Sequence, residues 1–242
     1  TGAPIDTTST LKIWLIHYDP TSHLLTAVDS LTLGCPYTTI HYQFLGEVAD
    51  SYRVKAAYIP STFSTTGYIP TYHTSSFYWH SADVLLHAAP GVNDSIDINM
   101  AYGTVTAGPG FIAGDVTTGA NKGTSGTVPA ANMLIFVLNS TGTVYQQTYT
   151  DATGHYSFSS LPLGTYTIYP EAINYATTAY VGINLTATTP TMMSASFGQH
   201  SISKTILPAT TGIKDLTTSV SSVIAFPNPT NGILTIQWNE TT

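Results

Sequence analysis

The chain has 242 residues, of which 43% are hydrophobic and only 8% are charged, and its formal net charge is −7. Its six Lys and Arg residues are scattered, so we expect neither nucleic acid nor an anionic membrane as a partner. No apolar run approaches the roughly 20 residues that a membrane-spanning helix needs. A single cysteine excludes an intramolecular disulfide and a cysteine-based metal cluster.

Short apolar or alternating runs, separated by Gly, Pro, Asn, Asp and Ser, recur along the whole chain, and no stretch shows sustained helical periodicity. Thr and Tyr are abundant, and β-branched and aromatic side chains favour a pleated sheet. The pattern therefore predicts an all-β fold of the sandwich type. The clearest predicted strands are Leu11–His17, Ile40–Phe44, Tyr52–Ala57, Val84–His87, Ile96–Met100, Met133–Leu138, Tyr145–Tyr149, Tyr156–Ser159, Tyr166–Tyr169 and Ser194–Phe197.

The order of these runs occurs twice, which indicates a duplicated domain. The first copy, at about 11–102, reads LKIWLIHYDP, IHYQFLGEVADSYRVKAAYIP and SIDINMAYG. The second copy, at about 110–198, reads MLIFVLNSTG, HYSFSSLPLGTYTIYPEAINY and MSASFG, and the run GFIAGDV opens it as a further strand. Each copy is long enough to bury a core of its own.

We therefore expect two tandem Greek-key β-sandwiches with extended terminal strands. The expected divisions are an N-terminal arm at 1–10, a first sandwich at 11–104 with an aromatic insertion at about 61–82, a second sandwich at 105–198, a Ser/Thr-rich linker at 199–223 and a strand segment at 224–242.

Three features of the second copy carry a family resemblance. They are the opening GFIAGDV, the central TDATGHYSFSSLPLGTYTIYPE and the following Tyr175. Through them the second copy resembles the carboxypeptidase-regulatory-like and Cna-B-like modules. The resemblance implies a transthyretin-like β-sandwich that serves as a stalk or spacer without catalytic activity. The first copy shares it through the repeat and through GYIPTYH, which resembles a segment of such modules in Bacteroidota surface proteins.

The C-terminal AFPNPTNGILTIQW resembles the opening of a type IX secretion sorting domain, although that domain continues for several more strands. The resemblance is carried by Pro227, Asn228, Pro229, Asn231, Gly232 and the alternating strand Ile233–Trp238. It implies an exported bacterial protein. The chain also begins without Met or an apolar leader segment, so we expect a mature protein that is extracellular or on the cell surface.

An unpaired strand at Ile233–Trp238 exposes backbone hydrogen-bonding groups, and pairing with a sheet of a neighbouring subunit satisfies them. A contact that repeats head to tail gives an open filament. We therefore expect self-association into a homopolymer, a surface fibre without enzymatic activity. The alternatives are a glycan-binding adhesin and a non-catalytic spacer from a larger secreted enzyme. The residues expected to mediate strand addition are Ile233, Leu234, Thr235, Ile236 and Trp238.

The insertion at 61–82 gathers aromatic side chains and two of the eight histidines. Aromatic faces stack on sugar rings, while His and Ser supply hydrogen bonds, so the insertion is a candidate platform for extracellular glycans. The alternative, which we prefer, is that the rings fill a satellite core as the insertion folds over the sandwich. The candidate glycan platform consists of Tyr72, His73, Tyr78, Trp79 and His80.

Short motifs point to two covalent modifications. Three Asp-Ser/Thr triplets resemble the O-glycosylation motif of Bacteroidota, which implies glycans on Thr7, Ser30 or Ser95. Cna-B-like modules can carry a Lys–Asn isopeptide bond promoted by a buried acid, and Lys12 and Asn99 are the candidates in the first copy. Glu171 lies where the acid would be in the second copy, which has no matching Lys. An exposed Lys and a strand-end Asn are the simpler interpretation.

No motif in the sequence indicates catalysis. The chain has no nucleophile elbow, no H-E-x-x-H zinc pattern, no EF-hand-like spacing of acids and no phosphate-binding glycine loop followed by Lys. The carboxylates Glu47, Asp97 and Glu171 lie in separate repeats or on expected edge loops rather than in one cleft. We therefore expect no enzymatic activity, no cofactor and no metal.

Overall fold

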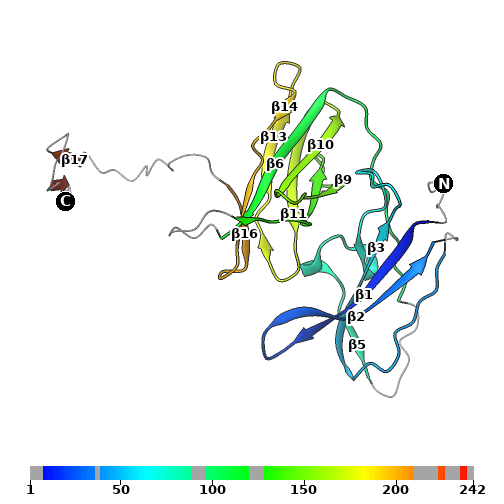
Figure 1. Ribbon diagram of the computed structural model, residues 1–242. Helices are drawn as coiled ribbons and strands as arrows, with labels where there is room; N and C mark the ends of the chain where they lie inside the picture. The colour runs from blue at the N-terminus through cyan, green and yellow to red at the C-terminus, as the bar shows by residue number, and fades with distance from the viewer. Residues whose placement is uncertain are drawn as a thin grey trace. The chain divides into compact units, whose positions relative to one another are not determined.

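The computed structural model describes residues 8–35, 39–88, 96–119 and 128–209, together with the backbone of strands Val223–Phe226 and Thr235–Trp238. The chain divides into two compact units, Thr1–Ala209 and Thr210–Thr242. Regular structure in the described part consists of β-strands and two single-turn 3₁₀ helices (Figure 1), which confirms the predicted all-β class. None of the described helices is long and apolar enough to cross a membrane.

The first sandwich is built on one antiparallel sheet with the order β2-β1-β3-β4, in which β5 also pairs with β3. Its strands are β1 (Thr10–Asp19), β2 (Leu24–Gly34), β3 (Asp50–Ile59), β4 (Thr71–Tyr72) and β5 (Leu85–His87). A tight turn joins β1 to β2, because the Asp19 carboxylate accepts hydrogen bonds from the Thr21 N–H and the Ser22 hydroxyl. Side chains at alternate strand positions then form the core of this sandwich. They are Ile13, Leu15, Tyr52, Val54 and Ala56.

Residues 40–44 and 96–100 cover this core, but they do not form the strands that the sequence predicts. Every second side chain packs on the core, namely Tyr42, Phe44, Ile96, Ile98 and Met100. Among the described residues, no backbone–backbone hydrogen bond involves either segment. The prediction of strands here was wrong because alternation determines which side chains are buried, whereas a strand also needs a hydrogen-bonded neighbour.

The second sandwich has two sheets, one ordered β10-β6-β15-β16-β12 with β14 and β7 also paired to β6, the other ordered β13-β11-β8-β9 (Figure 1). Its strands are β6 (Gly110–Thr118), β7 (Val128–Pro129), β8 (Leu134–Leu138), β9 (Val144–Tyr149), β10 (His155–Leu161), β11 (Gly164–Glu171), β12 (Ala176–Thr177), β13 (Tyr180–Leu185), β14 (Thr191–Met192), β15 (Phe197–His200) and β16 (Thr205–Pro208). The two sheets enclose one apolar core that includes Ile112, Ile135, Phe158, Ile168 and Phe197.

One sheet has the same strand order in both sandwiches. The order β2-β1-β3-β5 in the first corresponds to β9-β8-β11-β13 in the second, and all of these pairs are antiparallel. The correspondence follows the internal repeat of the sequence, strand by strand. The fold is therefore consistent with two β-sandwiches in tandem.

The second sandwich continues beyond residue 198, where the sequence places the start of a linker. β15 pairs in parallel with β6 and antiparallel with β16, which ends at Pro208. Residues 199–208 thus belong to a sheet, and the expected linker at 199–223 needs correction in this part. The sequence suggested a linker because the segment is rich in hydroxyl side chains. One apolar side chain, Ile206, is fully buried in the sandwich core.

In the second unit, β17 (Val223–Phe226) and β18 (Thr235–Trp238) form a two-stranded antiparallel sheet, with Val223 opposite Trp238. β18 falls within the predicted strand Ile233–Trp238.

Candidate functional site

The aromatic insertion forms the junction between the two sandwiches of the first unit. β4 joins it to the edge of β3, and the 3₁₀ turns η1 (His73–Ser75) and η2 (Trp79–Ser81) follow. Tyr78 contacts Phe136 on β8 with ring centroids 6.0 Å apart, and it packs edge-on against Tyr169 on β11 at 4.8 Å. The rings of the insertion therefore lie against the outer face of the four-stranded sheet of the second sandwich.

Hydrogen bonds reinforce this junction. The Trp79 backbone N–H donates to Glu171 Oε1 at 2.7 Å, and the Trp79 indole N–H donates to the Tyr175 carbonyl at 3.1 Å. The side chain of Gln147 on β9 donates to the Tyr68 carbonyl at 2.6 Å. Each of these bonds satisfies a half-buried or buried polar group at the junction, which favours one fixed arrangement of the two sandwiches.

The structure does not assemble the five residues of the candidate glycan platform into an open surface. Tyr72 is fully buried among Ile16, Leu25 and Ala82, so its ring offers no face to a sugar. Tyr78 and Trp79 are half-buried in the junction. The two imidazoles lie nearer the surface: His73 Nδ1 contacts the Asp97 carbonyl at 2.9 Å, and the His80 ring stacks on Tyr78.

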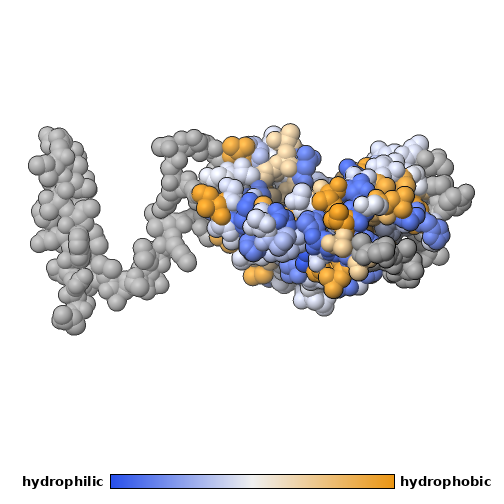
Figure 2. All heavy atoms as spheres, turned by 90° about the horizontal axis from the view of Figure 1, so that it is seen from below, coloured by the Kyte–Doolittle hydropathy of each residue, from blue (hydrophilic) through white to orange (hydrophobic). Residues whose placement is uncertain are grey.

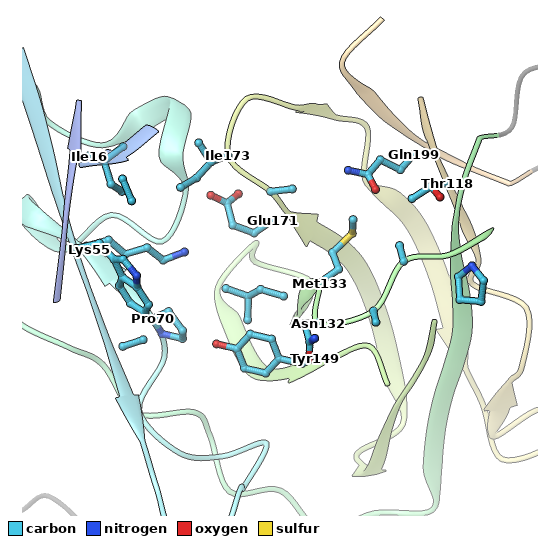
Figure 3. A pocket seen from close by; sticks show the side chains of 18 residues that line it. Ile16, Lys55, Pro70, Thr118, Asn132, Met133, Tyr149, Glu171, Ile173 and Gln199 are labelled. Carbon is cyan, nitrogen blue, oxygen red and sulfur yellow. The ribbon is translucent and has the colours of Figure 1, made fainter. Parts of the chain in front are cut away.

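A cavity of about 670 Å³ lies at the junction and is lined by both sandwiches (Figure 3). Lys55 reaches this junction cavity from β3 and Glu171 reaches it from β11, and their side chains face each other in Figure 3. No sequence pattern singled out Lys55, because it alternates with the core residues Val54 and Ala56 and therefore reads as solvent-facing. The signal that exists is Glu171, an acid without a matching lysine in its own copy.

Burial dominates the electrostatics of the junction cavity. Glu171 is 5% exposed; its Oε1 accepts the Trp79 N–H, while its Oε2 has no hydrogen-bond partner. Burial raises the pKa of Glu171 to about 7, against the opposing effects of the Lys55 charge and the Trp79 N–H. Burial lowers the pKa of Lys55, with Glu171 opposing. The carboxyl therefore exchanges its proton near neutral pH.

Lys55 and Glu171 are the charged residues among those that line the junction cavity. In the described part of the chain, no three His, Cys, Asp or Glu side chains come together in a way that could hold a metal. Lys55 Nζ lies 4.9 Å from the centroid of the Tyr72 ring, and burial raises the pKa of that phenol. The cluster thus joins charged and aromatic groups of two sandwiches at one point.

Lys12 and Asn99 lie apart, so the structure gives no support to an isopeptide bond between them. Lys12 is on the same face of β1 as Trp14, with Nζ 5.2 Å from the centroid of the Trp14 ring. Ile98 and Met100 cover the opposite face of that sheet, and Asn99 between them is exposed. Successive side chains of a strand point to opposite faces, which separates the two groups.

Of the remaining candidates, Ser30 is exposed on β2, an edge strand, and its N–H donates to Asp29 Oδ1 at 2.6 Å. Three of the strand-addition residues, Thr235, Ile236 and Trp238, lie in β18. The other candidates, Thr7, Ser95, Ile233 and Leu234, lie outside the described residues.

Comparison with known proteins supports the resemblance of the second copy. Residues 112–197, from β6 to β15, match the carboxypeptidase regulatory-like domain family. No curated protein matches the sequence. The chain is thus an all-β protein in which residues 112–197 are similar to the carboxypeptidase regulatory-like domain.

Three solved structures show a distant likeness. A minor pilin of Streptococcus agalactiae is 10% identical over 87% of this chain and 89% of its own, with a TM-score of 0.30. A point variant of BcpA, the major pilin subunit of Bacillus cereus, is 10% identical over 80% of this chain and 61% of its own, with a TM-score of 0.29. A C-terminal fragment of the pilus adhesin SpaC from Lactobacillus rhamnosus GG is 12% identical over 84% and 90%, with a TM-score of 0.23. TM-scores this low carry no argument about function.

Proposed function

We propose that the chain is a non-enzymatic structural protein of a bacterial cell exterior, exported by the type IX route, whose copies join into a filament by addition of the C-terminal strand. The observation that carries this proposal is the small size of the sheet that contains β18. It is a two-stranded sheet of β17 and β18.

The physical argument concerns unpaired backbone groups. A two-stranded sheet has two open edges, and a lone hairpin is marginally stable in water. The sequence around β18 alternates, with Leu234, Ile236 and Trp238 apolar and Thr235 and Gln237 polar. Such a strand gains both hydrogen bonds and apolar burial when it joins a sheet. Addition to another copy, repeated head to tail, produces a filament.

The first unit suits the role of a filament subunit. Its two sandwiches are tied by the ring contacts of Tyr78 and by the hydrogen bonds of Trp79. Because side chains of both sandwiches pack in the junction, a pull on one sandwich is transmitted to the other. The burial of Tyr72 disfavours the alternative of a glycan-binding surface on the insertion.

Electron microscopy of the purified full chain tests the proposal directly. We expect filaments from the wild type and from Ile236→Val, which keeps the strand. We expect monomers from Ile236→Pro, which removes a backbone donor, and from a chain lacking residues 223–242. Filaments of the shortened chain, or a wild type that stays monomeric at every concentration, would show the proposal to be wrong.

A further inference from the structure

Among its described residues, the first sandwich has no counterpart of β6, an inner strand of the larger sheet of the second sandwich. There β6 lies between β10 and β15, antiparallel to β10 and parallel to β15. In chain order, residues 40–44 lie between β2 and β3, as β10 lies between β9 and β11. Residues 96–100 follow β5, as β15 follows β13, so we match these two segments to β10 and β15. Among the described residues of the first sandwich, no strand corresponds to β6.

In residues 40–44 and 96–100 the side chains alternate as in a strand, but within the described part of the chain the backbone is not paired with a neighbouring strand. Their exposure alternates residue by residue, and their inward side chains share one core. The Tyr42 hydroxyl donates to the Ile96 carbonyl at 2.6 Å, which places both segments over the same face. In the described structure neither segment makes a backbone–backbone hydrogen bond, so each can still pair with an added strand.

Exposed apolar side chains lie close in sequence to both segments. Leu45 is 75% exposed, Val48 is 68% exposed and Val105 is 83% exposed. In the view of Figure 2, apolar residues gather in several separate patches among polar ones rather than in one continuous face. Large apolar side chains left in water next to an unpaired backbone are consistent with a surface that another chain covers.

The sequence pattern of Ile233–Trp238 resembles that of β6. In β6 the core residues Ile112 and Val116 alternate with the exposed Asp115. The C-terminal strand alternates in the same way, with apolar residues at every second position from Leu234. In the second unit β18 pairs with β17. A second copy supplies the occupant in the proposed filament, because a strand contact repeated from copy to copy builds an open assembly.

We propose that the C-terminal strand of a second copy inserts between residues 40–44 and 96–100, antiparallel to the first segment and parallel to the second. This inference rests on the proposed function, because it names the acceptor of the proposed strand addition. Insertion between two segments forms two rows of hydrogen bonds and covers one core. Addition at the outer edge of β2 or β13 forms a single row, so the central position is the more stable one.

Pairwise cross-linking of the full-length chain tests the acceptor. A Cys35→Ala background removes the native thiol, and Gln237→Cys places a thiol at a polar position of the alternating donor sequence. His41→Cys and Asn99→Cys mark the two flanking segments, because both side chains are exposed. Val28→Cys on β2 and Val181→Cys on β13 are matched controls at exposed positions of edge strands. A short bis-maleimide and gel electrophoresis report each pair, and circular dichroism checks that every variant folds.

We expect both the 41/237 and the 99/237 pairs to give ladders of covalent oligomers, and the two edge pairs to give none. Filaments whose cross-links form only at Val28→Cys or Val181→Cys would overturn the acceptor while leaving strand addition intact. A cross-link that leaves a single chain's mass would overturn the second copy as occupant. An absence of both filaments and ladders would refute the proposed function together with this inference.

Discussion

The side-chain amide of Asn174 hydrogen-bonds in both directions to the backbone of Leu25. The Leu25 N–H donates to Asn174 Oδ1 at 2.7 Å, and Asn174 Nδ2 donates to the Leu25 carbonyl at 2.9 Å. Asn174 has a positive φ of 69°, which Asn tolerates better than most residues. A side chain of the second sandwich thus takes the place of a paired strand at the edge of the first.

Replacement of Asn174 by Ala should destabilise the junction. It leaves two backbone groups of Leu25, itself 6% exposed, without partners, and we expect a loss of about 1–3 kcal/mol in the free energy of unfolding. Asn174→Gly, which relieves the backbone strain, should lose nearly as much. Urea denaturation measures both. Asn184→Ala, at an exposed site on β13, is the control and should change stability by less than about 0.5 kcal/mol. Equal stability of Asn174→Ala and Asn184→Ala would contradict the argument.

The raised pKa of Glu171 predicts a pH-dependent stability. The carboxyl binds its proton more tightly in the folded chain, with a pKa of about 7, than at its ordinary value of 4.5. Between these values the folded state holds more protons than the unfolded state, so the free energy of unfolding decreases as the pH rises. The two pKa values correspond to a decrease on the order of 3 kcal/mol over this window. Denaturation curves recorded from pH 4.5 to 8 measure it.

Glu171→Gln should remove most of this slope, because the amide does not titrate. Its charged and titratable neighbours Lys55, Tyr72, Tyr78 and Tyr169 remain in that variant. Glu47→Gln, which removes a carboxyl of the first sandwich, is the matched control and should keep the wild-type slope. If Glu171→Gln retains the slope between pH 4.5 and 7, another group is responsible.

The sequence pattern located several strands of the second copy, but it missed β13 and β16, and it placed the closing strand at Ser194–Phe197, whereas β15 spans Phe197–His200. Apolar alternation correctly located β8, β9, β10 and β11. In the folded chain each of these strands has a hydrogen-bonded neighbour, so the alternating segments became strands. Residues 40–44 and 96–100 show the limit of that method. They carry the same alternation, yet pairing depends on a third segment, and alternation contains no information about whether that segment is present.

The junction could not be predicted for a different reason. Lys55 and Glu171 come from separate copies, and they meet only because the outer faces of two sheets pack together. Tyr72 and Trp79 were recognisable as unusual because aromatic residues are concentrated in the insertion. Which surface those rings would cover depends on how the sandwiches dock, and strand periodicity does not encode docking.

The buried hydroxyl of Tyr72 makes a further test of the junction. It has no hydrogen-bond partner in the described structure, so Tyr72→Phe should leave stability unchanged or raise it by about 1 kcal/mol. Tyr156→Phe is the matched comparison in the core of the second sandwich, where the hydroxyl donates to the Ala195 carbonyl, and it should lose about 1 kcal/mol. Thermal and urea denaturation measure both. A clear loss in Tyr72→Phe would reveal a partner for that hydroxyl and contradict the prediction.

Gly114, on the central strand β6, tests how closely this strand approaches its neighbour. A β-carbon at Gly114 would lie 2.2 Å from the Ala195 carbonyl oxygen, and this close approach accompanies a hydrogen bond from the Ala195 N–H to the Ala113 carbonyl at 3.0 Å. Gly114→Ala must therefore displace backbone, and we expect a loss of about 1–3 kcal/mol. Gly142→Ala is the control, since its β-carbon meets nothing within 4 Å and only its positive φ of 79° opposes the change, at about 1 kcal/mol. Urea denaturation compares the two variants. A smaller loss of stability in Gly114→Ala than in Gly142→Ala would mean that the segment around Ala195 moves away at little cost, and that β6 does not need this close backbone contact.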